Sequence, residues 1–303
     1  MDDLKMPTGI ILKILSEFAY VFYEEKIYEC KAIGKLRHTK QTPITGDNVE
    51  FNILDENNFK GQVLQLLPRK NELYRPRIAN IDQVVIITAV REPVLNTFTL
   101  NKYLAFIEYL NIKPVLAFTK VDLLKENDAT YALLSEYKNL GYETYLINNM
   151  IETDAEWNAF LQSLLDKVSV FTGQTGAGKS TTLNHIIPDL FEPTQEISKA
   201  LNRGKHTTTK NELFHYFGGL IGDTPGFSSF EFKDFDKYQL AHSFKMFEEH
   251  LNACKFNDCL HLPETPGCKI LQLVHNHQIP NFIYDDYVKM QREMSEKEYR
   301  RKK

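Results

Sequence analysis

The sequence lacks any apolar run of about 18 residues, which is the length that a membrane-spanning helix needs. Residues 1–9 (MDDLKMPTG) are acidic and polar, unlike the basic and then apolar start of a secretory signal peptide. An excess of charge of one sign is also missing, because 36 Lys and Arg face 40 Asp and Glu, a net charge of -4. We therefore expect a cytoplasmic protein without a membrane partner, and any contact with RNA must be local.

Cysteine is scarce, and its distribution argues against disulfides. Of four cysteines, Cys30 stands alone while the other three lie within fifteen residues. No C-x-x-C pair occurs, which disfavours a redox site. The pattern Cys254-x4-Cys259-x-His261-x6-Cys268 supplies three thiolates and one imidazole, a closed set that suits one structural Zn²⁺. A chance group of buried thiols is the alternative.

The composition and the pattern of the first 70 residues predict a multidomain protein that begins with a small β-barrel. A chain of 303 residues with 43% hydrophobic positions accommodates roughly two or three domains. Short β-rich runs at 20–23, 27–33, 48–53 and 61–67 are separated by polar turns. We assign residues 1–70 to a small β-barrel or sandwich, and the family resemblance given below implies a barrel of the OB type. Its basic stretch 31–40 fits an RNA-facing loop as well as a strand edge protected by lysines.

Two further domains follow a connector at residues 71–79. Apolar runs alternate with helical segments over residues 80–233, which predicts an α/β domain with a mostly parallel sheet. Residues 234–303 are predicted to be helical, with helices over 235–250, 269–277 and 281–300 and the cysteine cluster between the first two. The fold class is thus a barrel, an α/β domain and a helical metal-binding domain.

The α/β domain contains a phosphate-binding loop. The segment GQTGAGKS fits G-x-x-x-x-G-K-[ST], follows an apolar strand and opens a helix. Backbone N–H groups there converge on the β- and γ-phosphates, while Lys179 bridges these phosphates and Ser180 ligates Mg²⁺. The expected nucleotide-binding residues are Gly173, Gln174, Thr175, Gly176, Ala177, Gly178, Lys179, Ser180 and Thr181.

Two more motifs predict GTP as the nucleotide. Thr119, Lys120 and Asp122 form T-K-x-D at a strand end, where the carboxylate of Asp122 accepts two hydrogen bonds from guanine. In D-T-P-G, Asp223 is expected near the magnesium and Gly226 near the γ-phosphate, although the string also fits a Pro-Gly turn. The base motif precedes the phosphate loop, the reverse of Ras-like GTPases, so we predict a circularly permuted P-loop GTPase domain.

The permuted order, the barrel, GQTGAGKS, the segment RGKHTTT at 203–209, DTPGF and the trailing Cys/His cluster together resemble the ribosome-small-subunit-dependent GTPase family (RsgA, also called YjeQ). The resemblance covers nearly the whole chain. It implies an OB-fold, a permuted GTPase domain and a C-terminal zinc domain, acting in late maturation of the small (30S) ribosomal subunit.

The resemblance also assigns roles to single residues. A threonine of the switch segment, Thr208 or alternatively Thr207, completes the Mg²⁺ shell when GTP is bound. His206 is a candidate to orient the attacking water unless it is only a surface histidine. Phe227 stands where Ras-like enzymes keep a glutamine, so intrinsic hydrolysis should be slow. Where the family has a Ser-Ala pair, this chain has Asn148-Asn149, and we expect the backbone amide of Asn148 to meet guanine O6.

We therefore predict a monomeric GTP hydrolase that uses GTP/GDP, Mg²⁺ and one structural Zn²⁺, with Lys179, His206 and Thr208 as catalytic residues. Its partners are the small ribosomal subunit and the rRNA of that subunit. The subunit is expected to stimulate hydrolysis. One alternative is a nucleotide-controlled rRNA-binding checkpoint in which hydrolysis only resets binding. Others are a P-loop ATPase or kinase with an incidental T-K-x-D, and a permuted GTPase of large-subunit assembly.

Overall fold

The computed structural model describes residues 6–32, 42–74, 76–151, 154–188, 211–223 and 236–301, with side chains up to residue 296. The chain forms two compact units. One unit contains the N-terminal barrel and residues 160–172 and 180–227, and the other contains residues 84–159, 173–179 and 228–303. Among the described helices, none has the length and apolarity needed to cross a membrane.

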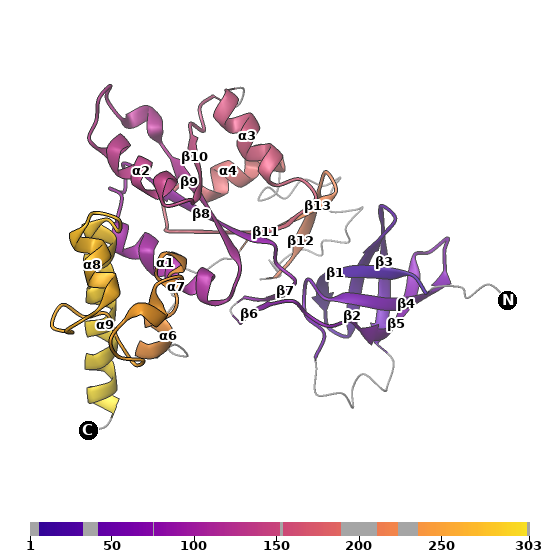
Figure 1. Ribbon diagram of the computed structural model, residues 1–303. Helices are drawn as coiled ribbons and strands as arrows, with labels where there is room; N and C mark the ends of the chain where they lie inside the picture. The colour runs from indigo at the N-terminus through magenta and orange to yellow at the C-terminus, as the bar shows by residue number, and fades with distance from the viewer. Residues whose placement is uncertain are drawn as a thin grey trace. The chain divides into compact units, whose positions relative to one another are not determined.

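The N-terminal barrel has five strands: β1 Thr8–Leu15, β2 Phe18–Tyr23, β3 Lys26–Ala32, β4 Asn48–Asp55 and β5 Lys60–Leu66 (Figure 1). The strand order β1-β2-β3-β5-β4 closes because β4 also pairs with β1. Only the β3–β5 pair is parallel. This is the order of an OB-type barrel, so the sequence prediction is confirmed. Strand β1 was not among the predicted β-rich runs.

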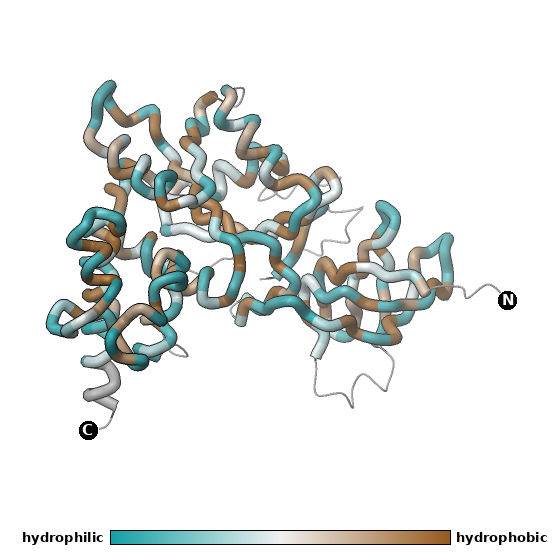
Figure 2. Tube along the Cα trace, viewed as in Figure 1, coloured by the Kyte–Doolittle hydropathy of each residue, from teal (hydrophilic) through white to brown (hydrophobic). Residues whose placement is uncertain are grey.

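The barrel core consists of inward-facing side chains from all five strands, which alternate with outward-facing side chains along each strand. Ile11, Val21, Val49 and Phe51 are all completely buried. Hydrophobic and hydrophilic positions accordingly alternate along the barrel strands (Figure 2). Cys30 is equally buried among them, and its burial raises the pKa of the thiol to about 12. It therefore serves as a small uncharged core residue.

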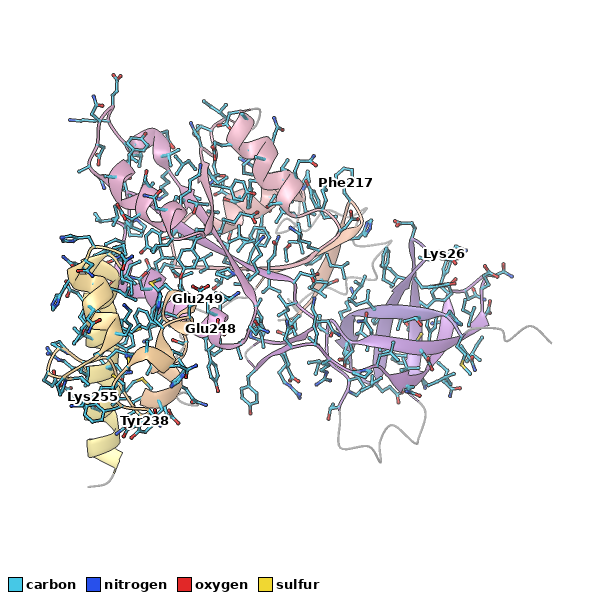
Figure 3. The ribbon with its side chains drawn as sticks, viewed as in Figure 1. Lys26, Phe217, Tyr238, Glu248, Glu249 and Lys255 are labelled. Carbon is cyan, nitrogen blue, oxygen red and sulfur yellow. The ribbon has the colours of Figure 1, made fainter. Side chains whose placement is uncertain are left out.

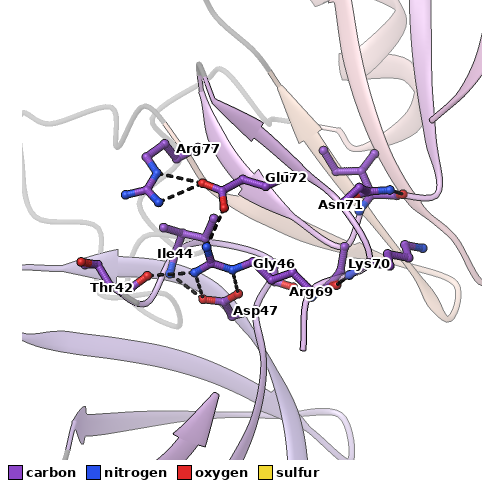
Figure 4. A network of polar contacts seen from close by, with 11 residues as sticks. Thr42, Ile44, Gly46, Asp47, Arg69, Lys70, Asn71, Glu72 and Arg77 are labelled. Atoms are coloured by element: carbon purple, nitrogen blue, oxygen red, sulfur yellow. Dashed lines mark hydrogen bonds and ion pairs between the residues drawn. The ribbon is translucent and has the colours of Figure 1, made fainter. Parts of the chain in front are cut away.

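A buried polar network joins the barrel to the connector that follows it (Figure 4). Asp47, which is completely buried, accepts hydrogen bonds from Arg69 Nε at 2.6 Å and from a terminal nitrogen of Arg69 at 2.8 Å. Arg69 also bonds Glu72 at 2.6 Å, at the start of the hairpin formed by β6 Glu72–Tyr74 and β7 Arg77–Ala79. The connector is therefore a short hairpin held by a charged network rather than a bare linker.

The central sheet has six strands: β8 Gln83–Ala89, β9 Lys113–Thr119, β10 Glu143–Ile147, β11 Val168–Gly173, β12 Leu213–Tyr216 and β13 Gly219–Asp223. Their order is β10-β9-β8-β11-β13-β12. The β9–β10 and β11–β13 pairs are parallel, and the edge strand β12 is antiparallel to β13. Strand β11, which leads into the phosphate loop, is central. Its neighbours are β8, which precedes it in the chain, and β13, which follows it. This arrangement confirms the permuted α/β fold.

Helices α1 Thr97–Tyr109, α2 Thr130–Asn139, α3 Ala155–Ser163 and α4 Lys179–Ile186 each follow a strand of the sheet. The C-terminal part contains α6 Lys237–Ala241, α7 Lys245–Glu248, α8 Lys269–His275, α9 Asn281–Arg301 and the 3₁₀ turn η4 Leu251–Ala253. The single helix predicted over 235–250 was wrong, because two short helices stand there. Ser243 Oγ bonds the carbonyl of Leu240 at 2.8 Å and ends α6, and the extended residue Phe244 begins α7.

The C-terminal helices are fastened to α1 through buried polar contacts. Asn101 Nδ2 donates to Asp286 of α9 at 2.7 Å, while its Oδ1 accepts from Tyr137 at 3.0 Å. The backbone N–H of Lys245, the first residue of α7, donates to Glu108 Oε2 at 3.1 Å. The C-terminal helices thus pack on α1, the helix that follows β8. In sequence, α1 precedes the phosphate loop by more than 60 residues.

The barrel also contacts the edge strand β12. Lys13 and Glu212 form a largely buried ion pair at 2.8 Å, and Thr45 Oγ1 donates to the carbonyl of Asn211 at 3.0 Å. The rings of Phe22 and His215 lie 4.8 Å apart between centroids. Beyond these contacts the exposed ring of Phe217 projects from the turn that joins β12 to β13 (Figure 3). The barrel is therefore attached to β12, the strand that follows residues 203–209 in the chain.

Candidate functional site

The phosphate loop leaves the end of β11 and passes directly into α4. Gly176 and Gly178 have φ values of +81° and +86°, in the left-handed region that favours glycine. At Gly173 a side chain is excluded for another reason, because a Cβ there would lie 2.3 Å from the carbonyl oxygen of Ile87 in β8. These glycines let the backbone wrap closely around a phosphate group.

The exposure of the loop suits an anion site at its surface. Thr175, Gly176, Ser180 and Thr181 are exposed, whereas Ala177 is anchored with 1% of its surface accessible. Lys179 and Ser180 occupy the first turn of α4, where backbone N–H groups have no partner within the helix. The loop therefore presents N–H groups, a lysine and a hydroxyl from one short stretch of chain.

The base motif begins at the last residue of β9. Thr119 is completely buried, and its Oγ1 donates a hydrogen bond of 2.5 Å to the carbonyl of Ala177 in the phosphate loop. Lys120 has a φ of +59° and bonds the carbonyl of Glu92 with its ammonium group. Asp122 lies exposed in the 3₁₀ turn η2 Val121–Leu123. Its carboxylate is thus accessible, as guanine recognition requires, while the hydroxyl of Thr119 is turned toward the phosphate loop.

The two asparagines after β10 lie beside this motif, because Ile147 pairs with Thr119 in the parallel ladder. Asn148 Oδ1 accepts from the backbone N–H of Met150 at 2.9 Å and so shapes its own turn. The side chain of Asn149 faces the phosphate loop instead, with Nδ2 3.2 Å from where a Cβ of Gly178 would lie. The contact of the backbone amide of Asn148 with guanine O6 stays a prediction, and the only signal for Asn149 in the sequence is a second amide next to the first.

Asp223 ends β13 and pairs with Phe171 of β11, two residues before the phosphate loop begins. The parallel ladder therefore places its carboxylate at the same end of the sheet as that loop. Gly226, Phe227 and the predicted switch residues Arg203–Thr209, with His206 and Thr208, lie outside the described residues. Their roles stay predictions.

The cysteine cluster forms a compact set of metal-binding atoms. The ligand atoms of Cys254, Cys259, His261 and Cys268 all lie within 4.8 Å of one another. His261 Nδ1 is 3.6 Å from the sulfur of Cys254 and 3.5 Å from that of Cys268, and these two sulfurs are 4.0 Å apart. Zinc–sulfur distances of ~2.3 Å separate tetrahedral ligand atoms by about 3.8 Å. The spacing fits a closed tetrahedral metal site.

The electrostatics of the cluster favour a cation. Burial lowers the pKa of His261 to about 4, so its ring stays neutral and keeps a lone pair for a metal. Burial and the neighbouring sulfurs raise the pKa of Cys268 to about 12, because thiolates repel one another when no cation is beside them. Tyr284 and Tyr287 hold the loop by donating to the carbonyls of His261 and Leu260.

Comparison with known proteins agrees with this arrangement. A sequence model of the RsgA GTPase family matches residues 66–233, and one of the RsgA N-terminal domain matches residues 8–63. The chain belongs to the RsgA GTPase family. The resemblance stated from the motifs is thereby confirmed, and this RsgA-family protein is a GTPase that binds guanine nucleotides.

Relatives of the RsgA-family protein match along their whole length. The Small ribosomal subunit biogenesis GTPase RsgA of Bacillus subtilis (strain 168) is 39% identical over 302 residues, covering 97% of this chain and 100% of that protein. The Small ribosomal subunit biogenesis GTPase RsgA 2 of Oceanobacillus iheyensis is 40% identical over 292 residues, covering 95% and 98%.

Two solved structures share the fold. The crystal structure of YloQ, described as a circularly permuted GTPase, matches with a TM-score of 0.82 and 33% identity over 98% of this chain and 97% of that one. The structure of YjeQ from Thermotoga maritima matches with a TM-score of 0.81 and 32% identity, covering 96% and 99%. The permuted order inferred from the motifs is thus shared with a structure described as permuted.

Proposed function

We propose that this RsgA-family GTPase acts in late maturation of the small (30S) ribosomal subunit in the cytoplasm. In this proposal it binds the rRNA of the subunit as a monomer, without a membrane partner, and the subunit stimulates its hydrolysis of GTP. The observation that carries the proposal is a permuted α/β sheet with a phosphate loop after β11, in a chain whose full-length relatives are named for small-subunit biogenesis.

In the proposed mechanism the backbone N–H groups of Gly173–Ser180 bind the β- and γ-phosphates, and Lys179 spreads the negative charge that develops between them. Ser180, Thr208 and Asp223 are the residues that would hold or orient Mg²⁺, which when bound would supply positive charge against the charge that develops on the phosphates. Asp122 accepts the guanine N–H groups. His206 is proposed to orient the attacking water, because Phe227 has no hydrogen-bonding group for that task.

The C-terminal cluster is proposed to hold one structural Zn²⁺. Three sulfurs and one imidazole would fill the four positions of a structural Zn²⁺ site and would leave none for a substrate. The metal would therefore stabilise the loop between η4 and α8 rather than take part in hydrolysis.

The decisive experiment measures GTP turnover with separated small subunits, separated large subunits and no subunits. We expect strong stimulation by small subunits only, and the same assay with His206→Ala should lose most of the stimulated rate. Equal rates under all three conditions would count against the proposal, and stimulation by large subunits would favour a role in large-subunit assembly. Inhibition of turnover by excess ATP would favour the ATPase or kinase alternative.

The checkpoint alternative predicts a different order of events. If the bound state performs the function, protein should leave the subunit only after hydrolysis, and a non-hydrolysable GTP analogue should trap it there without blocking maturation. Single-turnover hydrolysis measured beside subunit release distinguishes the two cases.

A further inference from the structure

The base motif and the following loop meet the phosphate loop at one place, the Ala177–Gly178 peptide. Thr119 reaches it from the end of β9 through the 2.5 Å hydrogen bond to the carbonyl of Ala177. Asn149 approaches it from the loop after β10, with Nδ2 3.2 Å from the point where a Cβ on Gly178 would lie. Thr119 Oγ1 is 3.6 Å from the same point. The side chains of Thr119 and Asn149, from neighbouring strand ends, therefore lie against the same turn of the phosphate loop.

The chemistry of Thr119 explains why a second group is needed. A threonine hydroxyl has a single proton, and here it is donated to Ala177. A carboxamide at that position would offer two N–H donors and a carbonyl, as in the usual N-K-x-D motif. Thr119 thus keeps one contact with the phosphate loop but has no donor left for another.

Asn149 brings the missing carboxamide to the same place from the adjacent loop. The register explains this placement, because Ile147 is paired with Thr119 and Asn149 lies two residues further along. The side chain of Asn148 is turned back on its own loop, where its Oδ1 accepts from the backbone N–H of Met150. Gly178 has a φ of +86° and no side chain, which leaves room for the amide of Asn149.

We propose that Asn149 is a positioning residue for guanine-nucleotide binding, whose carboxamide supplies the donor that Thr119 lacks and holds the base-recognition loops on the phosphate loop. The distance between the guanine subsite at Asp122 and the phosphate subsite at Lys179 then depends on this contact. The inference rests on the GTPase activity of the family and is independent of which ribosomal subunit the protein serves.

The test measures the affinity of the purified full-length protein for GDP and its intrinsic GTPase kinetics without ribosomes. We expect Asn149→Ala to weaken GDP binding by about threefold to tenfold, the worth of one net hydrogen bond. The contact is made equally in the ground and transition states, so KM should rise while kcat stays within about twofold. The matched control is Asn158→Ala, which removes an exposed amide from α3 and should change neither value.

Rescue separates positioning from a general structural role. Thr119→Asn introduces a carboxamide at the first motif position, so Asn149→Ala should cost less than about twofold in that background. If Thr119→Asn does not fold, the isosteric Thr119→Val replaces it, and its combination with Asn149→Ala should depart from additivity by at least about threefold. An affinity unaffected by Asn149→Ala, additive losses, or a fall in kcat with unchanged KM would overturn the proposal.

Discussion

Single buried residues decide much of the chemistry in this protein, and Glu108 is the clearest case. It is 6% exposed, it accepts from the backbone of Lys245, and the hydroxyl of Tyr142 lies 3.4 Å from the same oxygen. Burial raises its pKa to about 7, and the two hydrogen bonds offset only part of that rise. Glu108 therefore stays mostly protonated in the folded protein at mildly acidic pH.

The raised pKa of Glu108 predicts a pH dependence of stability. The unfolded carboxyl ionises near 4.5 and the folded one near 7, so the stability that this group contributes is fully present below pH 4.5 and is lost as the pH rises to 7. Between about pH 5.5 and 7.5 the wild-type protein should lose about 2 kcal/mol relative to Glu108→Gln.

Urea unfolding of both proteins across that pH range measures the difference. Glu136→Gln, on the exposed side of α2, is the matched control and should run parallel to the wild type. A wild-type curve that also runs parallel to Glu108→Gln would contradict the assignment.

At the scale of elements, largely buried ion pairs join the barrel to the segments that pack against it. The Arg69 fork bonds Asp47 in the turn before β4 and Glu72 at the start of β6, so one side chain links the barrel to the β6–β7 hairpin. The Lys13–Glu212 pair attaches β1 to the residue just before β12 in the same way. Such pairs are costly to break, because the remaining charge stays buried.

Arg69→Ala is expected to lower the free energy of unfolding of the barrel by about 3 to 5 kcal/mol, because Asp47 has no accessible surface and would lose its partner. The double variant Asp47→Asn, Arg69→Ala should recover part of this loss, since no unpaired charge remains. Lys26→Ala, which breaks the exposed Lys26–Glu56 pair at 3.4 Å, is the control and should cost less than about 1 kcal/mol. Denaturant unfolding followed through barrel tyrosines measures all three, and equal effects of Arg69→Ala and Lys26→Ala would refute the network.

At the scale of the whole molecule, the permuted order changes what each end of the GTPase domain is connected to. Residue 223, at the end of β13, leads along the chain toward the C-terminal helices, and those helices pack on α1 through Asn101 and Glu108. The Cys/His cluster lies among these helices, next to the aromatic residues Phe247, Tyr284 and Tyr287. Loss of a bound metal should therefore loosen the C-terminal helices before it affects the barrel.

Removal of zinc with a chelator is expected to lower the melting temperature and to increase hydrogen exchange in α8 and α9. The barrel strands β1–β5 should keep their protection, because none of the described ligands lies in them. Cys254→Ser should reproduce the effect, and the chelator should then change little more. Purified protein that contains no metal, or identical exchange with and without chelator, would argue against the zinc site.

The sequence alone determined the features that depend on local spacing. A phosphate loop and a Cys/His set are short strings whose chemistry follows from which groups stand a few residues apart, and the order of the motifs along the chain is sufficient to predict a permuted domain. The alternation of apolar residues likewise predicted the barrel and most strands and helices. These features require no knowledge of what packs against what.

Only the tertiary structure decided the features that depend on contacts between distant segments. The break between α6 and α7, the β6–β7 hairpin, the burial of Glu108 and the different surroundings of the Asn148 and Asn149 side chains all arise where one element meets another. Adjacent asparagines are chemically identical in a sequence. In the fold they differ. Following the register of β10 on β9, the side chain of Asn148 bonds its own turn, whereas the side chain of Asn149 faces the phosphate loop.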